Sequence, residues 1–211
     1  MKVDIAIVGA GFAGLGTAIR LDRSGRPDFV ILEAGSQVGG TWRDNRYPGA
    51  ACDIPSRLYS LSFAPKTDWT ARYARQPEIQ AYLEGLVDDH GLRDRLKLGA
   101  EVREARWDGT DWQLQLADGR TITARYVVYG IGALRIPRYP NVPGRDRFQG
   151  IQMHSAGWKD TSLQGLRVGV VGTGASAVQV VPAIASQVRS LSVFQRTPPW
   201  VIDRVDRDYG P

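Results

Sequence analysis

Cysteine, histidine and methionine are scarce in this sequence. The single cysteine, Cys52, excludes an internal disulfide and a zinc site built from cysteines. The two histidines, His90 and His154, lack the spacing of metal ligands, so we expect no metal. No apolar run approaches the ~20 residues that a membrane span needs, and the first residues do not resemble a secretory signal. We therefore expect a cytoplasmic protein without membrane contacts.

Acidic side chains are fewer than basic ones, with 22 Asp and Glu against 27 Lys and Arg, which gives a net charge of +5. The arginines are scattered along the chain, so we expect no nucleic acid as a partner. A mildly positive protein suits small anions such as dinucleotides. With 211 residues, of which 43% are hydrophobic, the chain is long enough to bury a core.

Glycine, by contrast, is abundant and forms a patterned turn near the amino terminus. The apolar segment Val3–Val8 predicts a strand, the glycine-rich turn Gly9–Gly14 follows it, and a helical pattern covers residues 11–24. A second apolar strand, Phe29–Leu32, ends at Glu33. This order of strand, glycine turn, helix, strand and acid is typical of a dinucleotide-binding unit.

Each residue of this first unit has a mechanical role. Gly9 permits the tight turn, Gly11 lets the backbone approach a pyrophosphate, and Gly14 allows close packing of helix and strand. The amino end of the helix, which includes Phe12 and Ala13, offers N–H groups to phosphates. Glu33 can accept hydrogen bonds from both hydroxyls of an unphosphorylated ribose.

The same pattern recurs later in the chain. A predicted strand, Arg167–Val171, leads into Gly172–Ala177, and a helix over residues 175–186 leads to the strand Leu191–Phe194. Arg196 lies 24 residues after Gly172, just as Glu33 lies 24 residues after Gly9. Arginine can bind a 2′-phosphate with two parallel hydrogen bonds, and Thr197 can add a hydroxyl, so the second unit should prefer NADP over NAD.

The chain between the two copies has its own pattern. Residues 35–64 predict an irregular segment, and residues 76–91 predict a helix with Pro77 in its first turn. Three short strands, Leu98–Ala105, Trp112–Leu116 and Thr121–Val128, read as an antiparallel meander. The fold class is therefore α/β, with two Rossmann-like dinucleotide-binding units, an inserted antiparallel β-meander, and an incomplete second unit.

Three stretches resemble the Baeyer–Villiger monooxygenases, a class of flavin-dependent monooxygenases. The resemblance rests on the segment from Gly39-Gly40-Thr41-Trp42 to Cys52-Asp53, on the pattern Phe148-x-Gly150-x-x-x-His154-x-x-x-Trp158, and on Val193–Pro198. In one departure, Lys159 follows Trp158 where the family has proline or aspartate. The similarity extends over nearly the whole chain.

The resemblance implies FAD and NADPH as cofactors, in that order along the chain. It divides the chain into an FAD-binding domain at 1–132 with the meander at about 95–128, a linker with the motif at 133–166, and a partial NADPH-binding domain at 167–211. The implied reaction inserts one oxygen atom of O2 beside a ketone carbonyl, through a C4a-peroxyflavin, and gives an ester or lactone. An N- or S-oxygenating flavin monooxygenase is the alternative enzyme.

Site residues follow from the motifs and the resemblance. Asp53 is the candidate catalytic residue beside the flavin, and the alternative is that Asp53 only caps a turn. Phe148, Gly150, His154 and Trp158 read as linker and packing residues. The expected cofactor-binding residues are Gly9, Gly11, Phe12, Ala13, Gly14, Glu33, Thr41, Trp42, Asp53, Tyr59, Val102, Gly172, Thr173, Gly174, Ala175, Ser176, Gln179, Arg196 and Thr197.

The chain is less than half as long as members of this family, so we expect a fragment that is inactive alone. The closing part of the FAD domain would lie beyond it. A partner of a split protein, completed by a second polypeptide, and a non-catalytic dinucleotide-binding remnant are the other interpretations.

Overall fold

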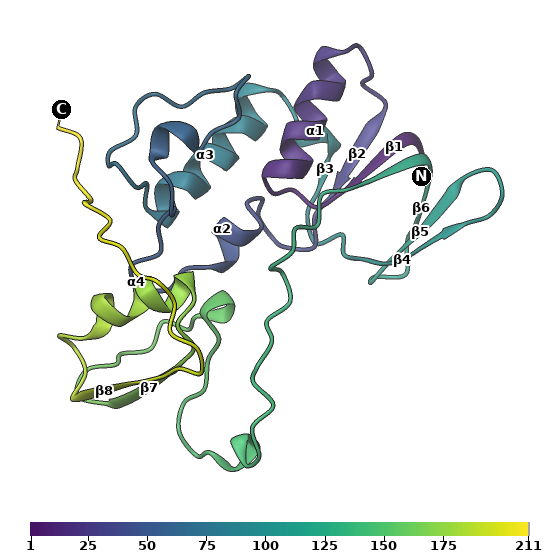
Figure 1. Cartoon of the computed structure of the whole chain (residues 1–211). Helices are drawn as coiled ribbons and strands as arrows, with labels where there is room; N and C mark the ends of the chain where they lie inside the picture. Colours follow the sequence, from purple (N-terminus) through teal and green to yellow (C-terminus); the bar gives the residue numbers. More distant parts are fainter. Residues whose placement is uncertain (211) are drawn as a thin grey trace. The chain divides into compact units, whose positions relative to one another are not determined.

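The computed structural model of the protein describes residues 1–210, which fall into two compact units. Unit 1 comprises residues 1–43, 61–64 and 79–135, and unit 2 comprises residues 44–60, 65–78 and those from 136 onward. The chain therefore passes between the units several times (Figure 1). The boundaries at 132 and 166 separate the predicted FAD-binding domain, linker and NADPH-binding domain. They stay a prediction.

Unit 1 is built on one mixed sheet in the order β3-β2-β1-β6-β5-β4. The first four of these strands run parallel to one another, whereas β5 and β4 are antiparallel to their neighbours. The strands are β1 (Lys2–Val8), β2 (Phe29–Leu32), β3 (Leu96–Lys97), β4 (Val102–Trp107), β5 (Trp112–Leu116) and β6 (Thr121–Tyr129).

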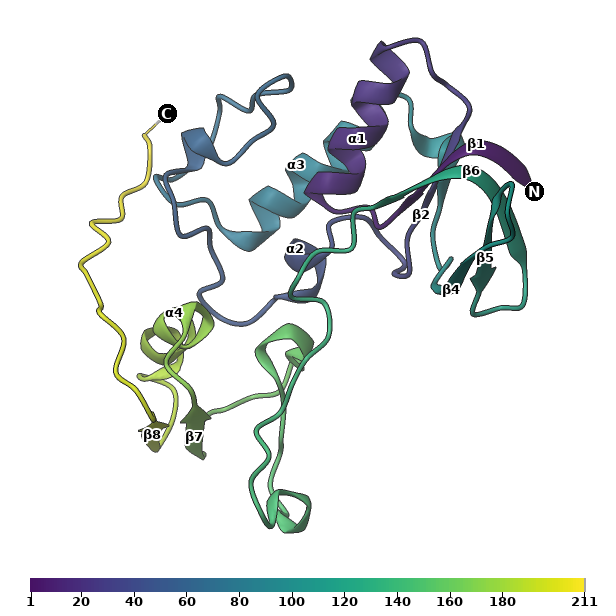
Figure 2. The ribbon, with the colours of Figure 1, turned by 45° about the vertical axis from the view of Figure 1, so that its right-hand side comes forward.

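Two helices lie together on one side of this sheet, α1 (Phe12–Arg23) and α3 (Gln76–Asp89) (Figures 1 and 2). In each helix the apolar side chains recur every three or four residues, which places them on the face that is buried. These buried side chains are Leu15, Ala18 and Ile19 in α1, and Ile79, Leu83, Leu86 and Val87 in α3. Both helices follow the predicted ranges closely.

Strand β6 pairs with one neighbour in parallel and with the other antiparallel. Its residue Thr123 pairs in parallel with Lys2 of β1 and antiparallel with Gln113 of β5. The meander is therefore continuous with the parallel sheet. It also starts later than predicted, at Val102, because β3 pairs with β2 and Gly99, with φ of 65°, then turns the chain.

The alternation of side chains along the strands creates a core on each face of the sheet. On one face, Ala6, Val30 and Leu32 pack with buried residues of the meander and its approach. Those residues are Ala100, Leu114, Leu116, Ile122 and Ala124. On the other face, Ile7 lies against Gly14 in the first turn of α1.

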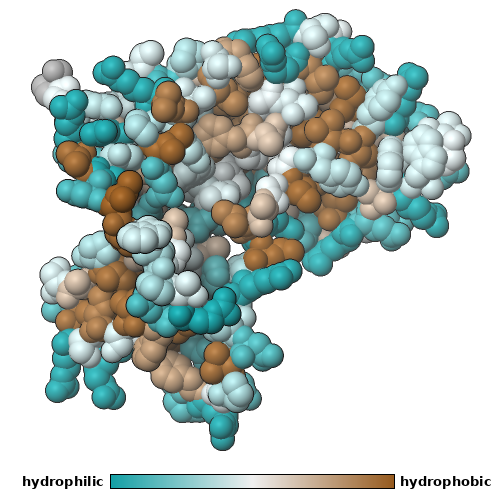
Figure 3. All heavy atoms as spheres, viewed as in Figure 1, coloured by the Kyte–Doolittle hydropathy of each residue, from teal (hydrophilic) through white to brown (hydrophobic). Residues whose placement is uncertain are grey.

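Unit 2 contains the second predicted copy, with β7 (Arg167–Val171), α4 (Ala175–Ile184) and β8 (Ser190–Phe194). The two strands pair in parallel, and α4 buries Val180 and Ile184 in a small cluster with Tyr47, Ala50 and Leu163. Apolar side chains also gather on the surface around these elements (Figure 3). Single-turn helices complete the chain: α2 (Thr41–Asp44), η1 (Ser56–Leu58), η2 (Arg93–Arg95), η3 (Arg145–Arg147) and η4 (Ser155–Gly157). The predicted fold class is confirmed.

The junction of β1 and α1 tolerates no side chain at Gly14. A Cβ atom built on Gly14 would lie 1.8 Å from the carbonyl oxygen of Gly9, which is backbone and cannot move aside cheaply. Gly14→Ala should therefore lower the free energy of unfolding by about 2–3 kcal/mol, as overpacked sites do. Urea denaturation measures the change.

A matched control is Gly85→Ala in α3, where the nearest atom to an added Cβ is 4.0 Å away. That substitution should raise stability by about 0.5–1 kcal/mol, because alanine loses less conformational entropy in a helix than glycine. Equal effects of the two substitutions would contradict the steric explanation.

Candidate functional site

The first glycine turn leaves the amino end of α1 open to an anion. Gly9 has φ of 101°, and an added Cβ would lie 2.6 Å from the carbonyl oxygen of Gly130, so only glycine fits. Gly11 precedes the helix, no side chain caps this end, and the first turn has no acid. An added Cβ on Gly11 would meet nothing closer than Gly40 Cα at 4.0 Å. The geometry suits a bound phosphate group.

Glu33 lies at this turn with its carboxylate buried. One oxygen accepts the backbone N–H of Ala10 at 2.8 Å, and the other accepts the N–H of Gly35 at 2.8 Å and Nη1 of Arg43 at 2.5 Å. The residue is 5% exposed. A carboxylate offers about four acceptor positions, and donors among residues 1–210 occupy three, so one position is left where the sequence predicted bonds from both ribose hydroxyls. The predicted acid therefore stands beside the predicted turn.

Arg43 is a site residue that the motifs did not reveal. Its guanidinium lies over Gly35, where an added Cβ would be 2.0 Å from Nη1, and it also donates to the carbonyl of Gln37. Gly130 was missed as well, although its place after the last strand of the meander was a usable signal. Nothing local in the sequence pairs Arg43 with Glu33.

The segment Gly39–Trp42 is attached to the same turn. The N–H of Gly39 donates to the carbonyl of Ala10 at 2.9 Å, and the N–H of Trp42 donates to the carbonyl of Gly39. Trp42 is buried, whereas Thr41 is exposed. Val102 begins β4 and packs partly on the core cluster that contains Val30 and Leu32. Unit 1 thus brings together the predicted residues Gly9 to Gly14, Glu33, Thr41 and Trp42.

Asp53 and Tyr59 belong to unit 2. Asp53 is exposed, and its Oδ1 accepts a hydrogen bond of 2.7 Å from Nε2 of Gln179. Tyr59 ends the single turn η1. The neighbouring Cys52 is buried, and burial raises the pKa of its thiol. A nucleophilic cysteine is not favoured by this environment.

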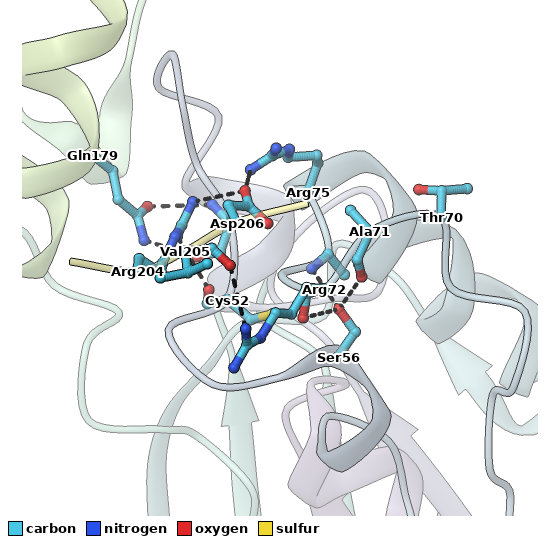
Figure 4. A network of polar contacts seen from close by, with 12 residues as sticks. Cys52, Ser56, Thr70, Ala71, Arg72, Arg75, Gln179, Arg204, Val205 and Asp206 are labelled. Atoms are coloured by element: carbon cyan, nitrogen blue, oxygen red, sulfur yellow. Dashed lines mark hydrogen bonds and ion pairs between the residues drawn. The ribbon is translucent and has the colours of Figure 1, made fainter. Parts of the chain in front are cut away.

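Within unit 2, a network of backbone and ionic contacts holds the chain around Cys52 and Ser56 (Figure 4). The hydroxyl of Ser56 is fully buried and accepts the N–H of Ala74 at 2.7 Å. Arg204 donates to the carbonyl of Cys52 at 3.4 Å, and Asp206 forms an ion pair of 2.7 Å with Arg75. Residues 204–206 therefore support the backbone that precedes Asp53.

The second glycine turn is more open than the first. Gly172 has φ of 108°, its N–H donates to the carbonyl of Phe194, and no atom lies within 4 Å of an added Cβ. Gly174 precedes α4 without a side-chain cap or an acid in the first turn. Ala177 occupies the third position. The expected phosphate-binding residues Gly172, Thr173, Gly174, Ala175 and Ser176 lie together here.

Arg196 and Thr197 follow β8 beside this turn. The hydroxyl of Thr173 lies 3.5 Å from the carbonyl oxygen of Thr197, a long contact that still fixes the neighbourhood. The Arg196 side chain is exposed, and within residues 1–210 it forms no ion pair. Its guanidinium donors are therefore available to an anionic ligand.

Residues of the linker motif contact other residues of unit 2. Phe148 lies over Gly150, where an added Cβ would be 2.5 Å from the ring. Nδ1 of His154 accepts the N–H of Ala156 at 3.1 Å, and the ring meets Tyr139 edge-on. Trp158 packs partly buried on the cluster around Leu163. The interpretation of these residues as linker and packing residues stays a prediction.

Across residues 1–210, no three His, Cys, Asp or Glu side chains gather where they could hold a metal ion. No helix in this range combines the length and the apolar character that crossing a bilayer requires.

The two units with their paired glycine turns define a class of nucleotide-binding oxidoreductase. The chain belongs to the pyridine nucleotide-disulphide oxidoreductase family, whose sequence profile matches residues 6–210. Within that class, a Baeyer–Villiger monooxygenase of Streptomyces coelicolor is 50% identical over 208 residues, which is 97% of this chain and 40% of that protein.

Solved structures show the same likeness. Cyclohexanone monooxygenase bound to ε-caprolactone matches with a TM-score of 0.94 and 39% identity over 100% of this chain and 42% of that one. OTEMO in complex with FAD and NADP matches with a TM-score of 0.92 and 33% identity over 99% of this chain and 41% of that one. The predicted resemblance is confirmed, and the chain spans about two fifths of the length of these relatives.

The Glu33–Arg43 pair should be essential to stability. Arg43→Met leaves a buried carboxylate without its counter-ion, which costs about 3–5 kcal/mol in comparable buried pairs. The double variant Glu33→Gln with Arg43→Met should lose less than the sum of the single variants, because the charge that needs a partner is gone. Urea titrations of the parent chain, the two single variants and the double variant measure the free energies of unfolding that this double-mutant cycle compares.

The control for this cycle is Arg103→Met, which breaks an exposed pair with Glu101. That change should leave the free energy of unfolding nearly unchanged, because exposed pairs are screened by solvent. Strict additivity in the Glu33 and Arg43 cycle would contradict the assigned coupling.

Proposed function

We propose that the chain provides the FAD-binding part and the beginning of the NADPH-binding part of a Baeyer–Villiger monooxygenase. The observation that carries this proposal is the pair of uncapped glycine turns with opposite charges at matching positions, Glu33 in the first and Arg196 in the second. Relatives named as Baeyer–Villiger monooxygenases support it.

FAD fits the first turn on the evidence of the chain itself. Space above Gly11, the uncapped end of α1 and an unused acceptor position on Glu33 suit a pyrophosphate and an unphosphorylated ribose. Trp42, Tyr59, Val102 and Asp53 would complete the flavin site by resemblance. When bound, FAD with NADPH supplies the electrons that activate O2 for transfer of one oxygen atom to a ketone.

NADPH fits the second turn for an electrostatic reason. The backbone N–H groups of Gly174 and Ala175, at the start of α4, point where a pyrophosphate would lie, and Ser176 can add a hydroxyl. The exposed guanidinium of Arg196 can bind the 2′-phosphate through two parallel hydrogen bonds, with Thr197 beside it. The first turn of α4 contains no acid, so no carboxylate there would repel the phosphates of the nucleotide.

The first test is whether the chain binds FAD through Gly11. The purified chain should take up FAD, as measured by equilibrium dialysis and by the flavin absorbance. Gly11→Ala should fold normally, because its Cβ has room, yet bind FAD about tenfold or more weakly, since a methyl group keeps the pyrophosphate from the backbone. Gly85→Ala serves as the control. A chain that stays colourless with added FAD would refute a flavin site and favour a non-catalytic remnant.

The second test concerns the choice between NADPH and NADH. Arg196→Ala should weaken NADPH binding by about 10- to 100-fold, because charge-assisted hydrogen bonds to the 2′-phosphate are lost, and should leave NADH binding almost unchanged. Fluorescence titration with each nucleotide measures both constants. Arg189→Ala, another exposed arginine of unit 2, should change neither. Equal losses for both nucleotides would show that Arg196 does not read the 2′-phosphate.

A further inference from the structure

Gln179 is a buried polar side chain on α4, the helix that follows the second glycine turn. It is 8% exposed. Within residues 1–210, every hydrogen bond of its side chain goes to residues 47–53, the segment that contains Asp53. The amide therefore serves this segment rather than the turn at Gly172.

Four hydrogen bonds hold the Gln179 amide. Its Oε1 accepts the Tyr47 hydroxyl at 3.1 Å and the Ala51 N–H at 3.2 Å. Its Nε2 donates to the carbonyl of Ala51 at 3.0 Å and to Oδ1 of Asp53 at 2.7 Å. Because Ala51 presents a donor to one end and an acceptor to the other, the amide can be placed only one way round.

The backbone of this segment lies directly against α4. Gly49 has φ of 82°, and an added Cβ would lie 2.7 Å from the carbonyl oxygen of Gln179 and 3.1 Å from Cβ of Ala183. Burial raises the pKa of the Tyr47 hydroxyl. A hydrogen bond with the Ser176 hydroxyl lowers this pKa in part, and the nearby Asp53 carboxylate raises it further. Tyr47 therefore lies within reach of Ser176, which is one turn before Gln179 on the same helix.

Asp53 receives its side-chain hydrogen bond from Gln179 alone among the described residues. An exposed carboxylate without such a bond would sample several rotamers. We propose that Gln179 is a positioning residue, which fixes the Asp53 carboxylate and the 47–53 segment on α4. The helix that begins at the second glycine turn thereby also sets the geometry of the candidate catalytic acid. The role of Asp53 rests on the proposed function, whereas the contacts of Gln179 do not.

The proposal is tested by amide hydrogen exchange of the full chain, followed by NMR without added cofactor. The Ala51 N–H is the reporter, because Gln179 is its acceptor. Gln179→Leu should accelerate exchange at Ala51 by about tenfold, the effect of losing one hydrogen bond. Gln187→Leu is the matched control, since among residues 1–210 the Gln187 side chain bonds only to the carbonyl of Ala183 in α4. Unchanged exchange at Ala51 in Gln179→Leu would overturn the proposal.

A second readout separates positioning from simple structural support. Gln179→Glu keeps an acceptor for the Ala51 N–H but removes the donor to the Ala51 carbonyl and to Asp53. The Asp53 side chain should then sample several rotamers, which NMR detects as averaged three-bond couplings between its α and β protons. Couplings typical of one fixed rotamer in this variant would show that Gln179 does not govern Asp53.

A third variant covers the case in which Gln179 substitutions unfold the chain. Asp53 is exposed, so Asp53→Leu should fold, and it should speed exchange of the Gln179 side-chain amide protons. No change there would refute the contact. If Gln179→Leu weakens only NADPH binding and leaves Ala51 protected, Gln179 is a nucleotide contact and the proposed function stands without this inference. If the chain binds neither cofactor, the exchange data still decide the role of Gln179.

Discussion

The first site depends on satisfying one buried charge. Glu33 is nearly excluded from water, and a buried carboxylate is stable only when donors surround it. Its donors come from three segments: the glycine turn at Ala10, the chain after β2 at Gly35, and α2 at Arg43. Displacing any of these segments would leave the charge short of a partner. The shape of the turn is therefore enforced electrostatically as well as sterically.

The two glycine turns differ in how tightly the protein packs around them. In the first, the acid is already engaged by the protein, and glycine contacts are so tight that an added Cβ at Gly9 or Gly14 would strike backbone. In the second, an added Cβ at Gly172 or Gly174 would meet nothing, and the arginine is exposed. The first arrangement suits a cofactor that stays bound. The second suits a nucleotide that enters and leaves.

The sequence predicted those features of the fold that depend on a local pattern of residues. Both glycine turns and the strands Phe29–Leu32 and Arg167–Val171 lie where the apolar runs placed them, because glycine and strand preferences act within a few residues. The contacts of Arg43 and Gln179 were invisible. Each depends on which backbone a side chain meets after folding, and Gln179 is 128 residues from Ala51. The double pairing of β6 was missed for the same reason, although its range was predicted closely.

That double pairing also sets the order in which the sheet can be completed during synthesis. Strand β1 is translated before the other strands of its sheet, yet its register partner for Lys2 is Thr123. At roughly 5–20 residues per second, the ribosome needs about 6 to 24 s to reach β6. During that interval the nascent chain can offer β1 only β2 as a neighbour, and the opposite row of N–H and C=O groups remains exposed. Only when β6 is available can β1 gain its second neighbour and the parallel strands join the meander.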